Sequence, residues 1–199
     1  MDTKLKVNNK IIFSTLLTSL FLLIYGCSPS GILATGGGTA MVVAEGDRSI
    51  GTVVDDATVK INIAAKFLNA GNNLFVDINT TVLEGRVLLT GLVDNQELRI
   101  EAVRLVWEIE GVREVVNEIE IGSREGIKDY AKDLWINTQA RGVAAKTIGL
   151  RVVAYNFETI NGKIYIAGIT TKPDQIDMLI ESLKTIKGVT EIVNYVIVK

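Results

Sequence analysis

Residues 84–93 read EGRVLLTGLV, and residues 161–170 read NGKIYIAGIT. In both stretches a turn ending in glycine precedes apolar residues at alternating positions, which is typical of the second strand of a β-hairpin. A second matching pair, EGVREVVNEIEI at 110–121 and KGVTEIVNYVIV at 187–198, lies downstream at the same offset of 77 residues. Because no insertion separates the two copies, the sequence predicts one structural unit that occurs twice.

The first helix and the hairpin of the first copy follow from two different apolar periods. Residues spaced at i, i+4 predict a helix whose inward positions are Val59, Ile63 and Phe67. Either Asp55 or Asp56 suits its N-cap, and Gly71-Asn72-Asn73 ends it. Alternation then predicts two strands, at 74–80 and 87–89, joined by a turn at Glu84-Gly85.

A second helix and a third strand complete the unit. Asn95 starts the helix and Gly111 stops it, with inward positions Leu98, Ala102, Leu105 and Ile109. Alternation from 115 to 121 predicts the strand, and Pro173 suits the first helical turn in the second copy. The predicted fold class is therefore α+β, with two tandem αββαβ domains at 55–122 and 123–199. Each is a three-stranded mixed sheet with two helices on one face, and units this small are expected to lean on each other.

Residues 1–26 have the composition of a secretory signal peptide. Three lysines precede an apolar run at 11–25, and Gly26 stands directly before Cys27, the only cysteine in the chain. As a helix the apolar run spans about 22 Å, short of the roughly 30 Å hydrocarbon core. A permanent transmembrane helix is therefore the weaker alternative.

The segment Ile24-Tyr25-Gly26-Cys27 resembles the lipobox of bacterial lipoproteins. This resemblance implies that the Cys27 thiol is acylated after cleavage, whereas the alternative is a buried free thiol. Ser28, by the same family rule, points to a lipid anchor in the outer membrane, facing the periplasm. Residues 27–54 are predicted to form a flexible Gly-rich linker; a phosphate loop at 36–38 is disfavoured because no Gly-Lys-Ser/Thr follows.

The αββαβ order resembles that of the BON domain, which has a glycine in the second strand and a closing Gly-Val…Val-Asn segment. The matching structural glycines are Gly91, Gly168, Gly111 and Gly188. With the lipobox, the two units resemble dual-BON outer-membrane lipoproteins. That resemblance implies a non-enzymatic protein that binds anionic phospholipid through its second BON domain and supports outer-membrane integrity. The implied lipid contact is the first helix of that domain, where Trp135 occupies the aromatic position; small residues at 142–145 depart from the family pattern.

Charge supports the same assignment independently. Residues 55–122 contain 12 acidic and 6 basic side chains, a net charge of −6, whereas residues 123–199 contain 8 acidic and 11 basic, a net charge of +3. This segregation favours an anionic partner at the second copy. The candidate lipid-binding residues are Trp135, Leu134, Lys128, Lys132 and Arg141.

Comparison of the copies predicts which aromatic and apolar residues reach the surface. A tryptophan on a helix is often core, but the partner of Trp135 at the 77-residue offset is Thr58, so we expect Trp135 to be exposed. Trp107 pairs with Lys184, which predicts partial exposure or an inter-domain contact. Ile136 pairs with Val59 and is expected to be buried.

An enzyme is poorly supported because the chain has no histidine, and no carboxylate pair is marked out as acid and base. Glu118 and Glu120 are expected on a solvated strand face. We predict no cofactor, no metal and no nucleic-acid partner. The alternative function is a protein-interaction or chaperone-like adaptor, in which the acidic first copy docks a partner such as the outer-membrane assembly proteins.

Overall fold

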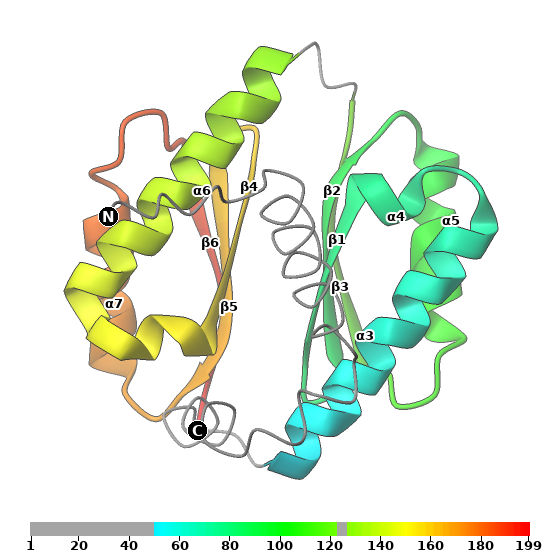
Figure 1. The fold of residues 1–199 in the computed structure, drawn as a ribbon, viewed down its shortest axis with the longest axis horizontal. Coiled ribbons are helices and arrows are strands. Elements are labelled where there is room, and N and C mark those ends of the chain that lie inside the picture. The colour runs from blue at the N-terminus through cyan, green and yellow to red at the C-terminus, as the bar shows by residue number, and fades with distance from the viewer. Residues whose placement is uncertain (1–49, 123–126) are drawn as a thin grey trace, which may run out of the picture. The chain divides into compact units, whose positions relative to one another are not determined.

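The computed structural model describes residues 50–122 and 127–199. The signal peptide, Cys27 and the linker as far as residue 49 lie outside the described residues. Each copy folds into helices packed on one face of a three-stranded sheet (Figure 1). The elements of the first copy are α3 (Ile50–Ala70), α4 (Leu74–Asp77), β1 (Ile78–Leu83), β2 (Arg86–Val93), α5 (Gln96–Trp107) and β3 (Glu114–Ile121).

The second copy repeats this order, with the 3₁₀ helix η2 in the place of α4. Its elements are α6 (Ile127–Ile148), η2 (Gly149–Ala154), β4 (Tyr155–Ile160), β5 (Lys163–Thr170), α7 (Pro173–Leu183) and β6 (Glu191–Val198). In each sheet the first two strands pair antiparallel and the last two pair parallel. The mixed three-stranded sheets and the αββαβ order are therefore confirmed.

The helices pack through the residues that the apolar spacing predicted. Val59, Ile63 and Phe67 of α3 are buried with the inward residues of α5 in one core, and a matching core forms under α6 and α7. The Asn95 side chain accepts a hydrogen bond of 2.9 Å from the Leu98 N–H, as expected of an N-cap. Pro173 occupies the first turn of α7, where its missing N–H leaves no hydrogen bond unmade.

Three expectations about the first copy were wrong. Helix α3 begins at Ile50, so it includes the last five residues assigned to the linker, and neither Asp55 nor Asp56 is its N-cap. Half-buried Val53 continues the inward face of α3 toward Asp56, which explains the earlier start. Residues 74–77 form the helical turn α4 in place of a strand, because Asn73 adopts a left-handed conformation with φ 59° and starts a new turn.

The face of each sheet away from its helices is covered by the other copy. Leu83 and Leu88 of the first sheet and Ala167 and Ile169 of the second form one buried cluster, with Tyr195 packed against it. Strands β2 and β5 are consequently buried on both faces. This contact agrees with the expectation that the copies lean on each other, and both belong to one compact unit.

The predicted solvated face at Glu118 and Glu120 was wrong for the same reason. Both side chains are half-buried against the second sheet. Glu118 accepts a hydrogen bond from the Tyr195 hydroxyl, and Glu120 accepts one of 2.7 Å from the Asn161 side-chain amide. Lys163 pairs with Glu120 at 2.9 Å, so these carboxylates join the two copies.

Candidate functional site

A buried aspartate ties the first helix of each copy to the hairpin turn of the same copy. The Asp56 carboxylate accepts hydrogen bonds from the backbone N–H groups of Glu84 at 2.8 Å and Gly85 at 2.9 Å. Asp133 accepts from Asn161 and Gly162, both at 2.9 Å. Two charge-assisted bonds satisfy each buried carboxylate, which explains how an acidic residue is tolerated inside the helix.

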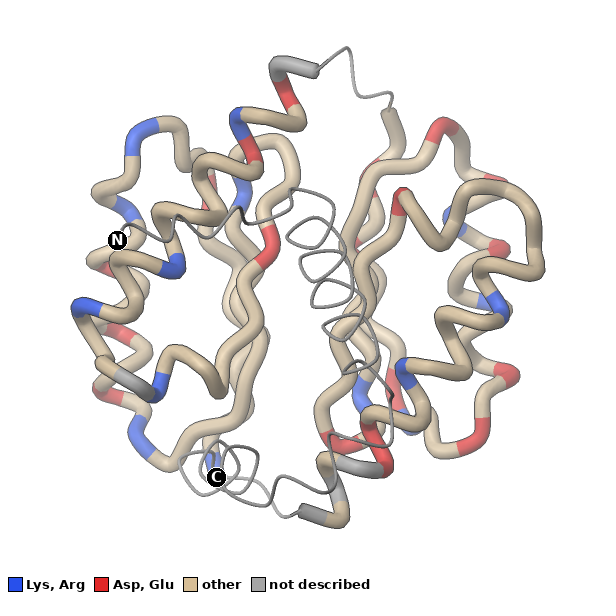
Figure 2. The backbone as a smooth tube through the Cα atoms, viewed as in Figure 1, with Lys and Arg blue, Asp and Glu red and all other residues tan. Residues whose placement is uncertain are grey.

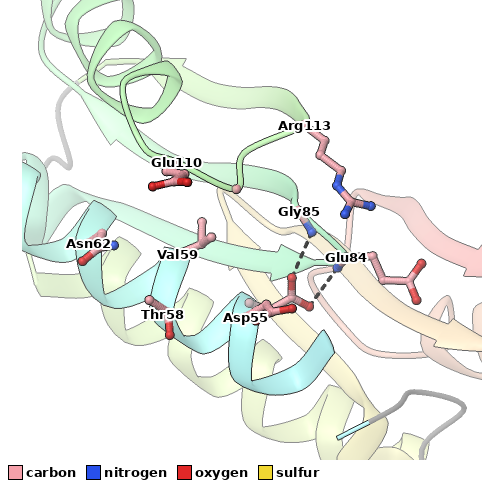
Figure 3. A pocket seen from close by; sticks show the side chains of 10 residues that line it. Asp55, Thr58, Val59, Asn62, Glu84, Gly85, Glu110 and Arg113 are labelled. Carbon is pink, nitrogen blue, oxygen red and sulfur yellow. Dashed lines mark hydrogen bonds between the residues drawn. The ribbon is translucent and has the colours of Figure 1, made fainter. Parts of the chain in front are cut away.

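In the first copy this junction forms a groove of about 490 Å³ between α3, the hairpin turn and the loop that precedes β3 (Figure 3). Val59 and Gly111 line it beside the buried Asp56. Asp55, Glu84 and Glu110 also line it, together with Arg113. We call these residues the acidic groove, because four carboxylates, one of them buried, line it with one guanidinium.

The equivalent positions of the second copy carry different charges. At the offset of 77, Asp55 becomes Lys132, Glu84 becomes Asn161 and Glu110 becomes Lys187. Thr58 and Arg113 become Trp135 and Thr190. Lys132, Trp135 and Lys187 are all exposed, and the Lys132 stem lies against Gly188, with its Cε 3.4 Å from where a glycine Cβ would stand. The region is therefore basic and aromatic in the second copy.

The outward face of α6 carries the exposed residues that the sequence singled out. Trp135 is 47% exposed and Leu134 is 55% exposed, whereas Ile136 is fully buried. The predicted exposure of Trp135 and burial of Ile136 are therefore confirmed. Residues along this face are apolar, small or hydroxyl-bearing: Ala131, Leu134, Trp135, Thr138, Gly142 and Ala145, all exposed. Gly142 and Ala145 thus extend the uncharged face, whereas Ala144 is buried in the core. Lys and Arg residues occur along the length of α6 (Figure 2).

Two of the predicted basic residues, Arg141 and Lys128, differ in what the structure shows of them. Arg141 lies six residues after Trp135, or about 600° around the helix, which places it on the other flank of α6. Its guanidinium donates a hydrogen bond of 3.3 Å to the Phe157 carbonyl and sits 5.8 Å from the centre of the Phe157 ring. Lys128 belongs to α6, but its side chain is outside the described residues.

The sequence analysis did not identify three features, two on the second copy and one on the first. Tyr130 on α6 is 53% exposed, and Lys187 adds a cation from a loop remote in sequence. The acidic groove is the third. The signal for Lys187 and for the groove lay in the repeat itself, because the exchanges of charge at the 77-residue offset are visible in the amino-acid sequence alone.

The structural glycines hold the backbone that frames these sites. A Cβ on Gly91 would stand 2.1 Å from the Asp77 carbonyl oxygen, so no side chain fits there. Gly111, with φ +91°, makes the left-handed turn that lines the acidic groove. Gly168 and Gly188 occupy the matching places in the second copy.

Trp107, the other tryptophan, is 52% exposed at the end of α5, so its predicted partial exposure is confirmed. Within residues 50–122 and 127–199, no helix is both long and apolar enough to cross a bilayer.

Relatives of this chain come from several bacteria. It is 35% identical over 147 residues to an uncharacterized protein of the gshII 5′ region of Anaplasma centrale, covering 73% of this chain and 96% of that protein. It is 30% identical over 161 residues to the outer membrane lipoprotein DolP of Haemophilus influenzae, covering 79% and 82%. It is 24% identical over 197 residues to the osmotically-inducible protein Y of Escherichia coli, covering 96% of each.

The family profile of the BON domain matches twice, at residues 55–123 and 132–199. Together the two matches cover more than half of the chain, and each contains one complete three-stranded sheet with the helix between its second and third strands. The chain therefore belongs to the BON-domain family and contains two copies of the domain.

Proposed function

We propose that this protein is an outer-membrane lipoprotein, acylated at Cys27 and facing the periplasm, that binds anionic phospholipid through α6 of its second BON domain. The likeness to DolP, whose name states that it is an outer membrane lipoprotein, supports the location. The lipobox-like segment supports the anchor. Such a protein supports outer-membrane integrity as a binding protein, without catalysis.

One observation carries the proposal. Trp135 and Leu134 are exposed on an uncharged helix face, and Lys132 and Lys187 stand at positions where the first copy has Asp55 and Glu110. An amphipathic ring beside cations is favoured at a membrane interface. Each lysine near an anionic surface contributes about 1 kcal/mol, so a few suffice once an acyl anchor keeps the domain near the bilayer.

The test is vesicle binding by the non-acylated form that begins at Asp47. It should bind phosphatidylglycerol vesicles, lose binding as salt rises, and ignore vesicles of neutral lipid. Trp135→Glu should abolish binding. The matched control is Trp107→Glu, which changes an equally exposed tryptophan in the first copy and should bind normally. Equal affinity for neutral and anionic vesicles would remove the basis of the proposal.

A second candidate function rests on the acidic groove. Its volume of about 490 Å³ accommodates a long basic side chain, and Asp55 and Glu110 are exposed to meet one. We propose that a protein partner, such as the outer-membrane assembly proteins, docks there through lysine or arginine. A photo-crosslinker at Glu110 should capture a protein in cells, whereas one at Lys187 should capture lipid. Recovery of lipid alone from both positions would exclude this docking.

A further inference from the structure

Three exposed apolar side chains gather where α3 meets α4, and we call them the α4 corner. Leu68 is 64% exposed, Phe75 is 51% exposed and Val76 is 78% exposed. No charged residue occurs from Phe67 to Val76. A corner of this kind can enter an apolar phase without desolvating an ion, which is the costly step for most exposed surfaces.

The α4 corner lies at the same end of the protein as the start of α6. Helix α4 leads directly into β1, whose Ile78 pairs with Gly91, so the corner stands where β2 and β3 finish. Glu120, near the end of β3, contacts Asn161 at 2.7 Å. Asn161 belongs to the second hairpin turn, and its backbone N–H donates a hydrogen bond of 2.9 Å to the Asp133 carboxylate of α6. These contacts bring the first turns of α6 to the end that carries the corner.

We propose that the α4 corner is a second bilayer contact, which enters the same membrane as the outward face of α6. The inference rests on the proposed lipid binding by α6. The corner has no cation, so its contribution is apolar and indifferent to the lipid headgroup, whereas Lys132 and Lys187 select anionic lipid. Two contacts on two domains fix the orientation of the protein on the bilayer as well as its distance.

The second copy supplies a matched control. Val153 stands at the position equivalent to Val76 and is 53% exposed. It lies on η2, which precedes β4 and therefore stands where β5 and β6 finish. Lys199, just past the end of β6, pairs with Glu84 of the first hairpin turn. The first hairpin turn lies at the end of the first sheet opposite the α4 corner. Because Lys199 and η2 both stand where β6 finishes, Val153 lies at that opposite end.

The test uses the full acylated chain reconstituted into vesicles of phosphatidylethanolamine and phosphatidylglycerol. A single cysteine is introduced by Val76→Cys, Leu134→Cys or Val153→Cys and labelled with an environment-sensitive fluorophore. All three side chains are more than half exposed, so the folds should be kept, and circular dichroism checks this. Doxyl-labelled lipid, which quenches only fluorophores that reach the acyl chains, is then added to the vesicles.

The expected result is quenching of the labels at 76 and 134, with the label at 153 unchanged. Quenching at 134 without quenching at 76 overturns the inference and leaves lipid binding by α6 standing. Quenching at none of the three overturns both. Equal quenching at 76 and 153 indicates adsorption without orientation and also overturns the inference. A signal at 76 that depends on protein density but not on the quencher assigns the corner to a second copy of the chain, which contradicts a bilayer contact.

Discussion

In both BON domains a buried aspartate joins the first helix to the hairpin turn, but the residues around this junction carry different charges in the two copies. Around the first, Asp55, Glu84 and Glu110 present carboxylates. Around the second, the equivalent positions hold Lys132, Asn161 and Lys187, with Trp135 added where the first copy has Thr58. The buried aspartate and the left-handed glycine are the same in both: Asp56 with Gly111, and Asp133 with Gly188.

This comparison separates the residues that fix the backbone from the exposed residues that can contact a partner. Residues that fix the backbone are unchanged between copies, because each satisfies a buried hydrogen bond or a tight turn that both copies share. Residues that face solvent are free of this constraint, and their charge is reversed at Lys132 and Lys187 and lost at Asn161. Function in this protein is therefore expected to follow the exposed positions of the repeat, and stability to follow the buried ones.

The largest effect on the comparison should come from the two strand glycines. Gly91→Ala should cost about 3 kcal/mol or more of unfolding free energy, because its Cβ meets a backbone oxygen at 2.1 Å and its φ is +152°. Gly168→Ala should cost less, about 1–3 kcal/mol, since its closest contact is a side-chain ring, that of Tyr155, and not a backbone oxygen. Urea unfolding of the two variants measures the difference. Equal losses would show that the close approach at Gly91 relaxes easily.

The buried aspartates should be equivalent. Asp56→Asn and Asp133→Asn each present an amide N–H₂ to a turn that offers only N–H donors. One buried donor is then unpaired, and the loss should be about 2 kcal/mol in either copy. Thermal unfolding measures both, and exposed Asp55→Asn is the control that should change little. A marked difference between copies would mean that the two turns are not held in the same way.

Lys187 gives a smaller and sharper test of function. Lys187→Ala should weaken binding to phosphatidylglycerol vesicles about fivefold, from the loss of about 1 kcal/mol at the anionic surface. Glu110→Ala, its equivalent in the first copy, should leave vesicle binding unchanged. Both variants should unfold at the wild-type temperature. If Glu110→Ala alters affinity as much as Lys187→Ala, the division of charge between copies has no bearing on lipid.

The smallest effect should appear in the pH dependence of the contact between domains. Burial alone raises the pKa of Glu120, but hydrogen bonds from Lys163 and Asn161 and the Lys163 charge more than offset it and hold the pKa below its ordinary value of 4.5. The folded state thus favours the carboxylate, so its stabilisation is present above pH 4.5 and is lost as pH falls through the lowered pKa.

The measurement is the unfolding free energy of the wild type and of Glu120→Gln across that acidic range. The wild type should lose more stability on acidification than the variant, whose amide does not titrate. Parallel pH profiles would indicate that Glu120 is equally solvated in the folded and unfolded states. Tyr195, whose pKa is raised to about 12 by burial and by its hydrogen bond to Glu118, stays protonated throughout.

Local patterns predicted the elements well where the role of a residue depends only on its neighbours in sequence. Asn95 as an N-cap, Pro173 in the first turn of its helix and the inward face of α3 all follow from local chemistry. Exposure of Trp135 followed from comparing the copies. Alternation was misleading at Leu74 and Val76: both fit the apolar face of a strand, but in the helical turn α4 Leu74 is buried and Val76 is 78% exposed.

The contact between domains could not be predicted from the strands. Glu118 and Glu120 alternate with apolar residues, which is the pattern of a strand with one solvated face. The sequence of the strand is the same whether its polar face contacts water or a neighbouring domain. What covers them are Tyr195, Asn161 and Lys163, more than forty positions away in sequence. Only the placement of the second sheet distinguishes the two cases.

Strands β2 and β5 are buried on both faces, and this has a consequence for the isolated domains. A BON domain separated from the other copy would expose an apolar sheet face, formed by Leu83 and Leu88 in the first copy or by Ala167 and Ile169 in the second. Such a face invites aggregation. Deletion of either copy is therefore expected to destabilise the other, whereas substitutions on the outer surface of each copy do not disturb this contact.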